Sequence, residues 1–82
     1  MDTLVLYTAP GFKECDKVRD YLRHLHVEFE EKDVSEDKAA FEEMARVSWQ
    51  MGVPVLRRGK DFVFGSDVVA LEAFLLRCFS NR

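Results

Sequence analysis

The residues with the clearest potential for chemistry lie in the segment YTAPGFKEC, residues 7–15, where an apolar stretch runs into a Pro-Gly turn and then reaches Cys15. A cysteine near the start of a helix is typical of thiol redox sites, because the helix dipole and the free N–H groups there stabilise a thiolate. Such chemistry usually places another sulfur three residues upstream, and that position holds Phe12. The other cysteine, Cys78, lies far away in the sequence without metal-ligand spacing, so we assign no metal site.

Length and composition indicate one small globular domain covering residues 1–82, with 48% apolar and 33% charged residues. A net charge of −3 argues against nucleic acid as a partner. No signal-peptide pattern is present, and no run approaches the roughly 18 apolar residues of a membrane span, so we expect no membrane partner. Two cysteines without a disulfide framework favour a reducing compartment, so we expect a cytoplasmic protein.

Hydrophobic periodicity predicts a β-α-β-α-β-β-α order of elements. A short strand over 3–8 precedes an amphipathic helix from Lys13 to about His24, with Cys15, Val18, Leu22 and Leu25 on its inner face. The remaining elements are an alternating strand over 27–34, a helix that begins at Ser35, a hairpin with a solvated tip at 57–60, and a last helix capped by residues 65–67. We expect Phe41, Met44 and Ala45 to face inward from the middle helix, and Leu71, Phe74, Leu75 and Cys78 from the last.

These elements predict an α/β protein with a four-stranded mixed sheet and helices on both faces. A right-handed crossover makes the first two strands parallel, and the hairpin adds two antiparallel strands.

The sequence resembles a glutaredoxin of the small bacterial kind, within the thioredoxin-like superfamily. Three motifs carry this resemblance in the family's order: YTAPGFKEC, then Gly52-Val53-Pro54, then Gly65-Ser66-Asp67. The resemblance implies a three-layer sandwich, a cis bond before Pro54 and a thiol-disulfide oxidoreductase ancestry. It also implies that Val53, Pro54, Gly65, Ser66 and Asp67 belong to a groove that binds glutathione or a peptide.

The sequence departs from the family pattern at the nucleophile. If Cys15 matches the second, resolving cysteine of the CxxC motif, Phe12 stands at the first, and a phenyl ring cannot form a mixed disulfide. Many glutathione-dependent members carry a lysine where this chain has Ala9, and Lys13 could partly substitute for it. Cys15 itself is either a core residue or a residual reactive thiol.

Two aromatic residues stand where the family has small ones or cysteine. Phe12 lies outside any core period, and Trp49 follows the middle helix where the family often has a helix-ending glycine, so Gly52 would have to make that turn. We expect Phe12, Trp49 and Met51 to share one end of the sheet. The rings either form a partner-binding face or fold back into the vacated groove.

We therefore expect a glutaredoxin-fold protein without the nucleophile, acting as a binding or self-associating module, either a natural variant or a redesigned scaffold. The alternative is a thiol-disulfide oxidoreductase with residual or ancestral activity through Cys15. We assign no cofactor, although the resemblance admits glutathione. The expected partner is another protein or a second copy of the chain.

Overall fold

A computed structural model describes residues 3–79 and arranges them as a four-stranded sheet with three helices. The elements are β1 (Leu4–Thr8), α1 (Lys13–His24), β2 (Glu30–Asp33), α2 (Lys38–Ser48), β3 (Val55–Arg58), β4 (Asp61–Phe64) and α3 (Val68–Phe79). The strand order is β2-β1-β3-β4, with β1 parallel to β2 and antiparallel to β3, and β3 antiparallel to β4. The predicted fold class, a thioredoxin-like α/β sandwich with a mixed sheet, is confirmed.

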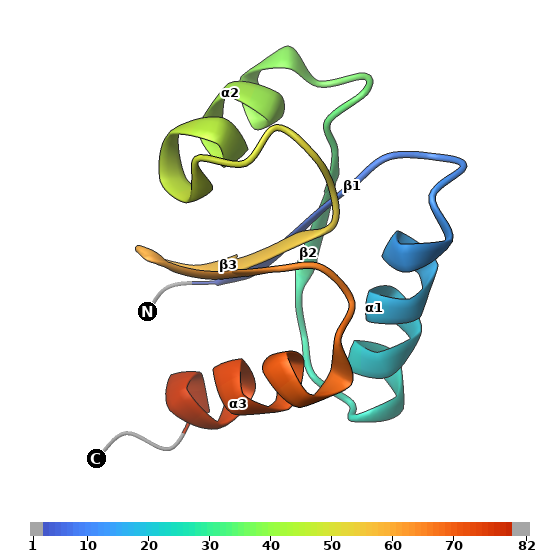
Figure 1. Cartoon of the computed structure of the whole chain (residues 1–82), viewed down its shortest axis with the longest axis vertical. Coiled ribbons are helices and arrows are strands. Elements are labelled where there is room, and N and C mark those ends of the chain that lie inside the picture. Colours follow the sequence, from blue (N-terminus) through green and yellow to red (C-terminus); the bar gives the residue numbers. More distant parts are fainter. Residues whose placement is uncertain (1–2, 80–82) are drawn as a thin grey trace.

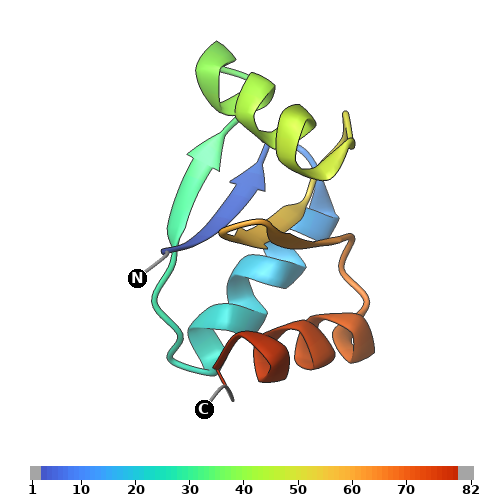
Figure 2. The same cartoon turned by 90° about the vertical axis from the view of Figure 1, so that its left-hand side faces the viewer.

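The helices lie on both faces of the sheet, as expected. Figure 1 shows α2 above the sheet and α1 and α3 on the other side, and Figure 2 shows the same layers from the side. Within residues 3–79, no helix has the length and apolar character needed to cross a bilayer.

Side chains of β1 contribute to two hydrophobic cores, one on each face of the sheet, because successive side chains of a strand point to opposite faces. Leu4 and Leu6 join the cluster on the side of α1 and α3, where the largest fully buried ring is Phe74. Val5 and Tyr7 join the cluster on the side of α2. All five residues of β1 are buried, as expected for a strand that is covered on both faces.

The structure corrects two predicted boundaries and the expected burial of Leu25. The middle helix begins at Lys38 instead of Ser35, because the carboxylate of Asp37 caps it by accepting the Ala40 N–H at 3.1 Å. Ser35 instead donates its N–H and hydroxyl to Asp33, at 2.9 and 2.6 Å, which forms a turn. The helix before it ends at His24, as predicted, but Leu25, expected inside, is its C-cap and is 43% exposed.

The predicted strand over 27–34 is also too long, since β2 covers Glu30–Asp33 only. Pairing with β1 begins at Val5 and Glu30. The alternating pattern of residues 27–29 arises because Val27 and Phe29 are half-buried against the cluster on the side of α1 and α3. These residues lie outside β2 and do not belong to the sheet. Of the expected inward residues of α2, Met44 is fully buried, and Phe41 and Ala45 are half-buried.

A polar network under α2 ties this helix to three strands, β1, β2 and β3. Glu43 of α2 accepts hydrogen bonds from the Tyr7 hydroxyl and from Arg57 Nη1, both at 2.8 Å, and an ion pair from Lys32 Nζ at 3.1 Å. Arg57 also donates to the Tyr7 hydroxyl at 3.2 Å. Burial, together with the bond to Glu43, raises the pKa of Tyr7 to about 12. Burial alone would raise the pKa of Glu43, but these hydrogen bonds and cations outweigh it and lower that pKa.

The same contacts correct the prediction of a solvated hairpin tip. Arg57 is held by Glu43 and Tyr7, while Arg58 donates to the Cys78 carbonyl and lies 5.0 Å from the centre of the Phe79 ring. Both arginines therefore pack against the helices, one on each side of the sheet.

Replacing Glu43 by Gln is expected to lower the free energy of unfolding by about 1–3 kcal/mol, because a hydrogen-bonded charge is lost while Arg57 and Lys32 stay half-buried. Urea denaturation measures this change. The matched control is Glu42→Gln at the exposed neighbouring position, with an expected change within about 0.5 kcal/mol. Equal effects of the two substitutions would show that the network does not stabilise the fold.

The stabilisation by Glu43 should also depend on pH. A carboxyl whose pKa is lower in the folded than in the unfolded chain contributes stability above its unfolded pKa, near 4.5, and loses it as the pH falls through the folded pKa. The stability difference between the parent chain and Glu43→Gln should therefore be largest near neutral pH and shrink in acid. Urea unfolding over this pH range measures the difference, and a difference that grows in acid would contradict the assignment.

Candidate functional site

The candidate site is the edge of the sheet at which β1 ends, β3 begins and β4 ends, which we call the Pro54 edge. Tyr7 pairs with Val55, and the Gly65 N–H donates to the Pro54 carbonyl at 3.0 Å, so three connections meet here. In Figure 1 these connections lie on the right of the molecule, between β1 and α1, before β3, and before α3. Both α1 and α3 therefore begin at this edge.

Phe12 occupies the first position of the site, as the N-cap of α1. Its backbone is extended, with φ −108° and ψ 110°, and its carbonyl accepts the Cys15 N–H at 3.0 Å. No side chain caps this helix, and the Phe12 ring is 50% exposed. The next residue, Lys13, is exposed as well. The residue at position 12 thus stands at the positive end of the helix dipole, facing solvent.

Cys15 lies one turn inside α1 and has no exposed surface. Burial raises the pKa of its thiol, and the Ala9 backbone and the Arg19 charge offset this only in part. Cys78, on α3, is also buried, and burial likewise raises the pKa of its thiol. Since the thiolate is the reactive form, these observations support the interpretation of Cys15 as a core residue.

Residues of the second and third motifs meet at this edge, where the Gly65 N–H donates to the Pro54 carbonyl. The bond between Val53 and Pro54 is cis, and Val53 packs against the cluster under α2. Gly65 has φ +100°, a conformation that strongly favours glycine. The predicted cap of the last helix is confirmed, because Asp67 accepts the Val69 N–H on its carboxylate at 3.2 Å and the Leu71 N–H on its carbonyl at 2.9 Å. Ser66, between Gly65 and Asp67, is half-buried.

Trp49 does not fill the groove. It is 88% exposed, so the interpretation in which both rings fold back is wrong for this residue. The expectation that Gly52 makes the turn is also wrong, because Trp49 itself is the C-cap of α2, with φ 62° and its N–H bonded to the Ala45 carbonyl. A left-handed conformation costs a residue with a Cβ about 1–2 kcal/mol. Met51, in the same loop, is 70% exposed.

Phe12 and Trp49 do not form a single aromatic face. In Figure 1 the C-terminal end of α2, which carries Trp49, lies on the left of the view, whereas the connection between β1 and α1, which carries Phe12, lies on the right. The reason is the direction of α2, which runs across the sheet away from the β1–α1 connection. The loop over residues 49–53 then returns to the Pro54 edge.

One polar cluster near Cys15 was missed by the sequence analysis. Arg19 Nη2 lies 2.7 Å from Glu31 Oε2, which also accepts the hydroxyl of the buried Thr8 at 2.9 Å. The hydrogen bond from Arg19 is the main cause that lowers the pKa of Glu31. Arg19 sits one turn after Cys15 on α1, a spacing visible in the sequence, but its partner on β2 becomes evident only in the fold.

Comparison with known proteins gives consistent results. The family model described as Glutaredoxin matches residues 4–63. An uncharacterized glutaredoxin-like 8.6 kDa protein in a rubredoxin operon of Clostridium pasteurianum is 27% identical over 70 residues, which cover 85% of this chain and 93% of that protein.

Two solved structures show the same architecture. The crystal structure of a glutaredoxin from Archaeoglobus fulgidus superposes with a TM-score of 0.82 at 21% identity, covering 92% of this chain and 87% of the other. The solution structure of a glutaredoxin from Brucella melitensis superposes with a TM-score of 0.70 at 29% identity, covering 95% of this chain and 86% of the other. Since the family model spans residues 4–63, well over half of the sequence, this chain belongs to the glutaredoxin family.

Proposed function

We propose that this chain is a non-catalytic glutaredoxin that binds an extended peptide segment of a partner protein at the Pro54 edge. The observation that carries the proposal is Phe12 at the N-cap of α1, the position that the resemblance assigns to the nucleophilic sulfur. Both cysteines of the chain are buried, and both thiols have raised pKa values. Thiol-disulfide exchange needs an accessible thiolate, and neither thiol meets that requirement in this fold.

Two features of the Pro54 edge support peptide binding there. Val53 precedes the cis bond to Pro54, and Asp67 places an exposed carboxylate at the start of α3 that suits an ammonium group. Phe12, half-exposed, supplies an apolar contact at the point where a sulfur would react. Aromatic side chains are common anchors of protein interfaces. Partner binding through Phe12 and Trp49 together stays a prediction, but their separation favours Phe12 as the anchor of the Pro54 edge.

If the chain is non-catalytic, the rate at which it reduces a small mixed disulfide with glutathione should equal the rate without protein. Phe12→Cys is expected to create activity, because a thiol at this N-cap gains the helix dipole that lowers a thiol pKa. The control is Lys17→Cys, which places an exposed thiol on α1 away from its start and should remain near background. The rate of disulfide reduction measures the effect.

Activity of the unmodified chain would contradict the proposal if Cys15→Ser abolished it. In that case Cys15 would be a working nucleophile despite its burial. Comparing Phe12→Cys with the double variant Phe12→Cys, Cys15→Ser then shows whether the introduced thiol acts alone or needs Cys15 as a resolving partner.

The binding half can be tested with S-methylglutathione, a tripeptide that has no free thiol. We expect NMR shift changes at Val53 and at residues 65–67 on titration. Asp67→Asn should weaken binding up to about fivefold, because an exposed ion pair is worth about 0.2–1 kcal/mol. Asparagine caps a helix as well as aspartate does, so the fold should be unaffected. Asp61→Asn, on the hairpin, is the charge-matched control; shift changes away from the Pro54 edge would refute peptide binding there.

A further inference from the structure

The outer side of α3 is unusually apolar for a surface helix. Among its twelve residues only Glu72 and Arg77 are charged. Together with Leu25, the C-cap of α1, it forms a surface that we call the base surface, made of Leu25 (43% exposed), Val68 (53%), Val69 (73%), Leu76 (60%) and Phe79 (55%). Surface helices normally carry polar residues on the side away from the core. In Figure 1 α3 lies at the bottom of the described chain, and the exposed fractions of these five side chains show that residues 3–79 leave them largely uncovered.

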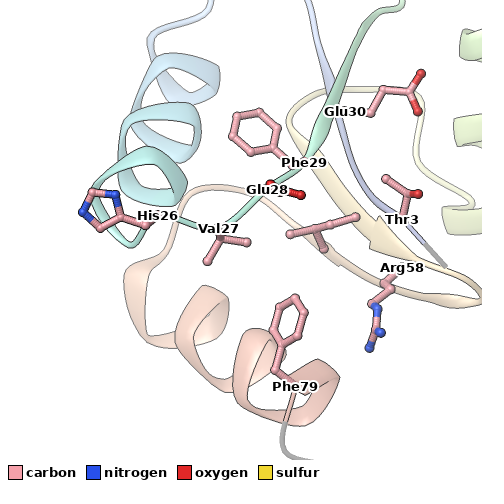
Figure 3. Close-up of a pocket in the computed structure, with 9 residues that line it drawn as sticks. Thr3, His26, Val27, Glu28, Phe29, Glu30, Arg58 and Phe79 are labelled. Atoms are coloured by element: carbon pink, nitrogen blue, oxygen red, sulfur yellow. The ribbon is translucent and has the colours of Figure 1, made fainter. Parts of the chain in front are cut away.

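The base surface is hollowed on both sides of Phe79. A hollow of about 320 Å³ between α1 and α3 is lined by residues that include Leu25, Leu76 and Phe79. A second hollow of about 580 Å³ is bounded by Phe79, Val27 and Arg58. Figure 3 shows the Phe79 ring pointing from α3 toward Val27 and the segment that leads into β2, with Arg58 beside it. Ridges and hollows of this kind allow side chains of a partner to interdigitate.

We propose that the base surface binds a second copy of this chain, in a two-fold symmetric dimer. The first argument is area. From their exposed fractions, the five apolar side chains expose on the order of 500 Å² in total. A standard interface buries about 800 Å² per partner, of which about 56–65% is apolar, so the base surface supplies the apolar area of one partner.

The second argument is charge. In a two-fold contact the same patch meets itself, so a patch with charges of one sign would repel its copy. The base surface and its hollows carry three carboxylates, Glu28, Glu30 and Glu72, and two guanidinium groups, Arg58 and Arg77. Arg58 lies over Phe79 and Arg77 lies 5.5 Å from the centre of the Phe74 ring, so both cations stand next to apolar groups. Because both signs are present, a two-fold contact can place carboxylates of one copy opposite guanidinium groups of the other.

The test is the mass of the chain in solution, measured by sedimentation velocity over a range of concentrations. We expect the parent chain to reach twice the monomer mass, and Leu76→Glu to raise the dimer dissociation constant at least tenfold, since it places a charge at the centre of the patch. Met51→Glu is the matched control, because Met51 is at least as exposed as Leu76, at 70% against 60%, but lies in the loop over residues 49–53, and it should leave the dimer intact.

Leu25→Glu, on the other side of the smaller hollow, is a second variant. Circular dichroism checks that each variant is folded, and if one of them misfolds, the other still tests the interface. A parent chain that stays monomeric at every concentration would overturn the proposal and leave the surface to a different protein. A dimer that survives both Leu76→Glu and Leu25→Glu would also overturn it. So would a dimer that dissociates with Met51→Glu or with Phe12→Ser and Trp49→Gly, because its interface would then lie outside the base surface.

Discussion

The burial of β1 on both faces is the constraint on which the rest of the structure depends. A strand whose five residues are all buried needs a neighbour on each side and a helical layer on each face. The neighbouring strands are β2 and β3, which both pair with β1. The helical layers are α2 on one face and α1 with α3 on the other. The Tyr7 hydroxyl is buried in the process, and Glu43 and Arg57 satisfy it.

The same strand also determines where chemistry could take place. Because β1 ends beside the start of β3, the N-termini of α1 and α3 and the cis Pro54 meet at one edge. A helix N-terminus favours a thiolate or another anion, and in this chain the residue that receives this advantage is Phe12. The residue that the fold places at the N-terminus of α1 is therefore an aromatic ring, half-exposed to solvent.

The exposed apolar residues fall into separate regions, and they differ in kind. Phe12 is exposed at the start of α1, and Asp67 presents an exposed carboxylate at the start of α3, so the Pro54 edge offers both apolar and charged groups. The exposed residues of α3 are mostly apolar, with Val69, Leu76 and Phe79 each more than half exposed. The proposed peptide binding uses the first region and the proposed self-association uses the second, so one experiment can test each without disturbing the other.

The sequence alone was enough to predict the element order, the fold class and the three motifs of the Pro54 edge, because hydrophobic period, Gly and Pro positions and helix caps are local signals. The resemblance also predicts that Phe12 stands at the position of the family's first cysteine, which stays a prediction. Only the tertiary structure decided that Trp49 lies far from Phe12, that Arg57 and Arg19 find carboxylates on other elements, and that the outer side of α3 stays uncovered. These outcomes depend on the direction in which each helix crosses the sheet. That direction determines which residues far apart in the sequence come into contact, and local sequence patterns do not determine it.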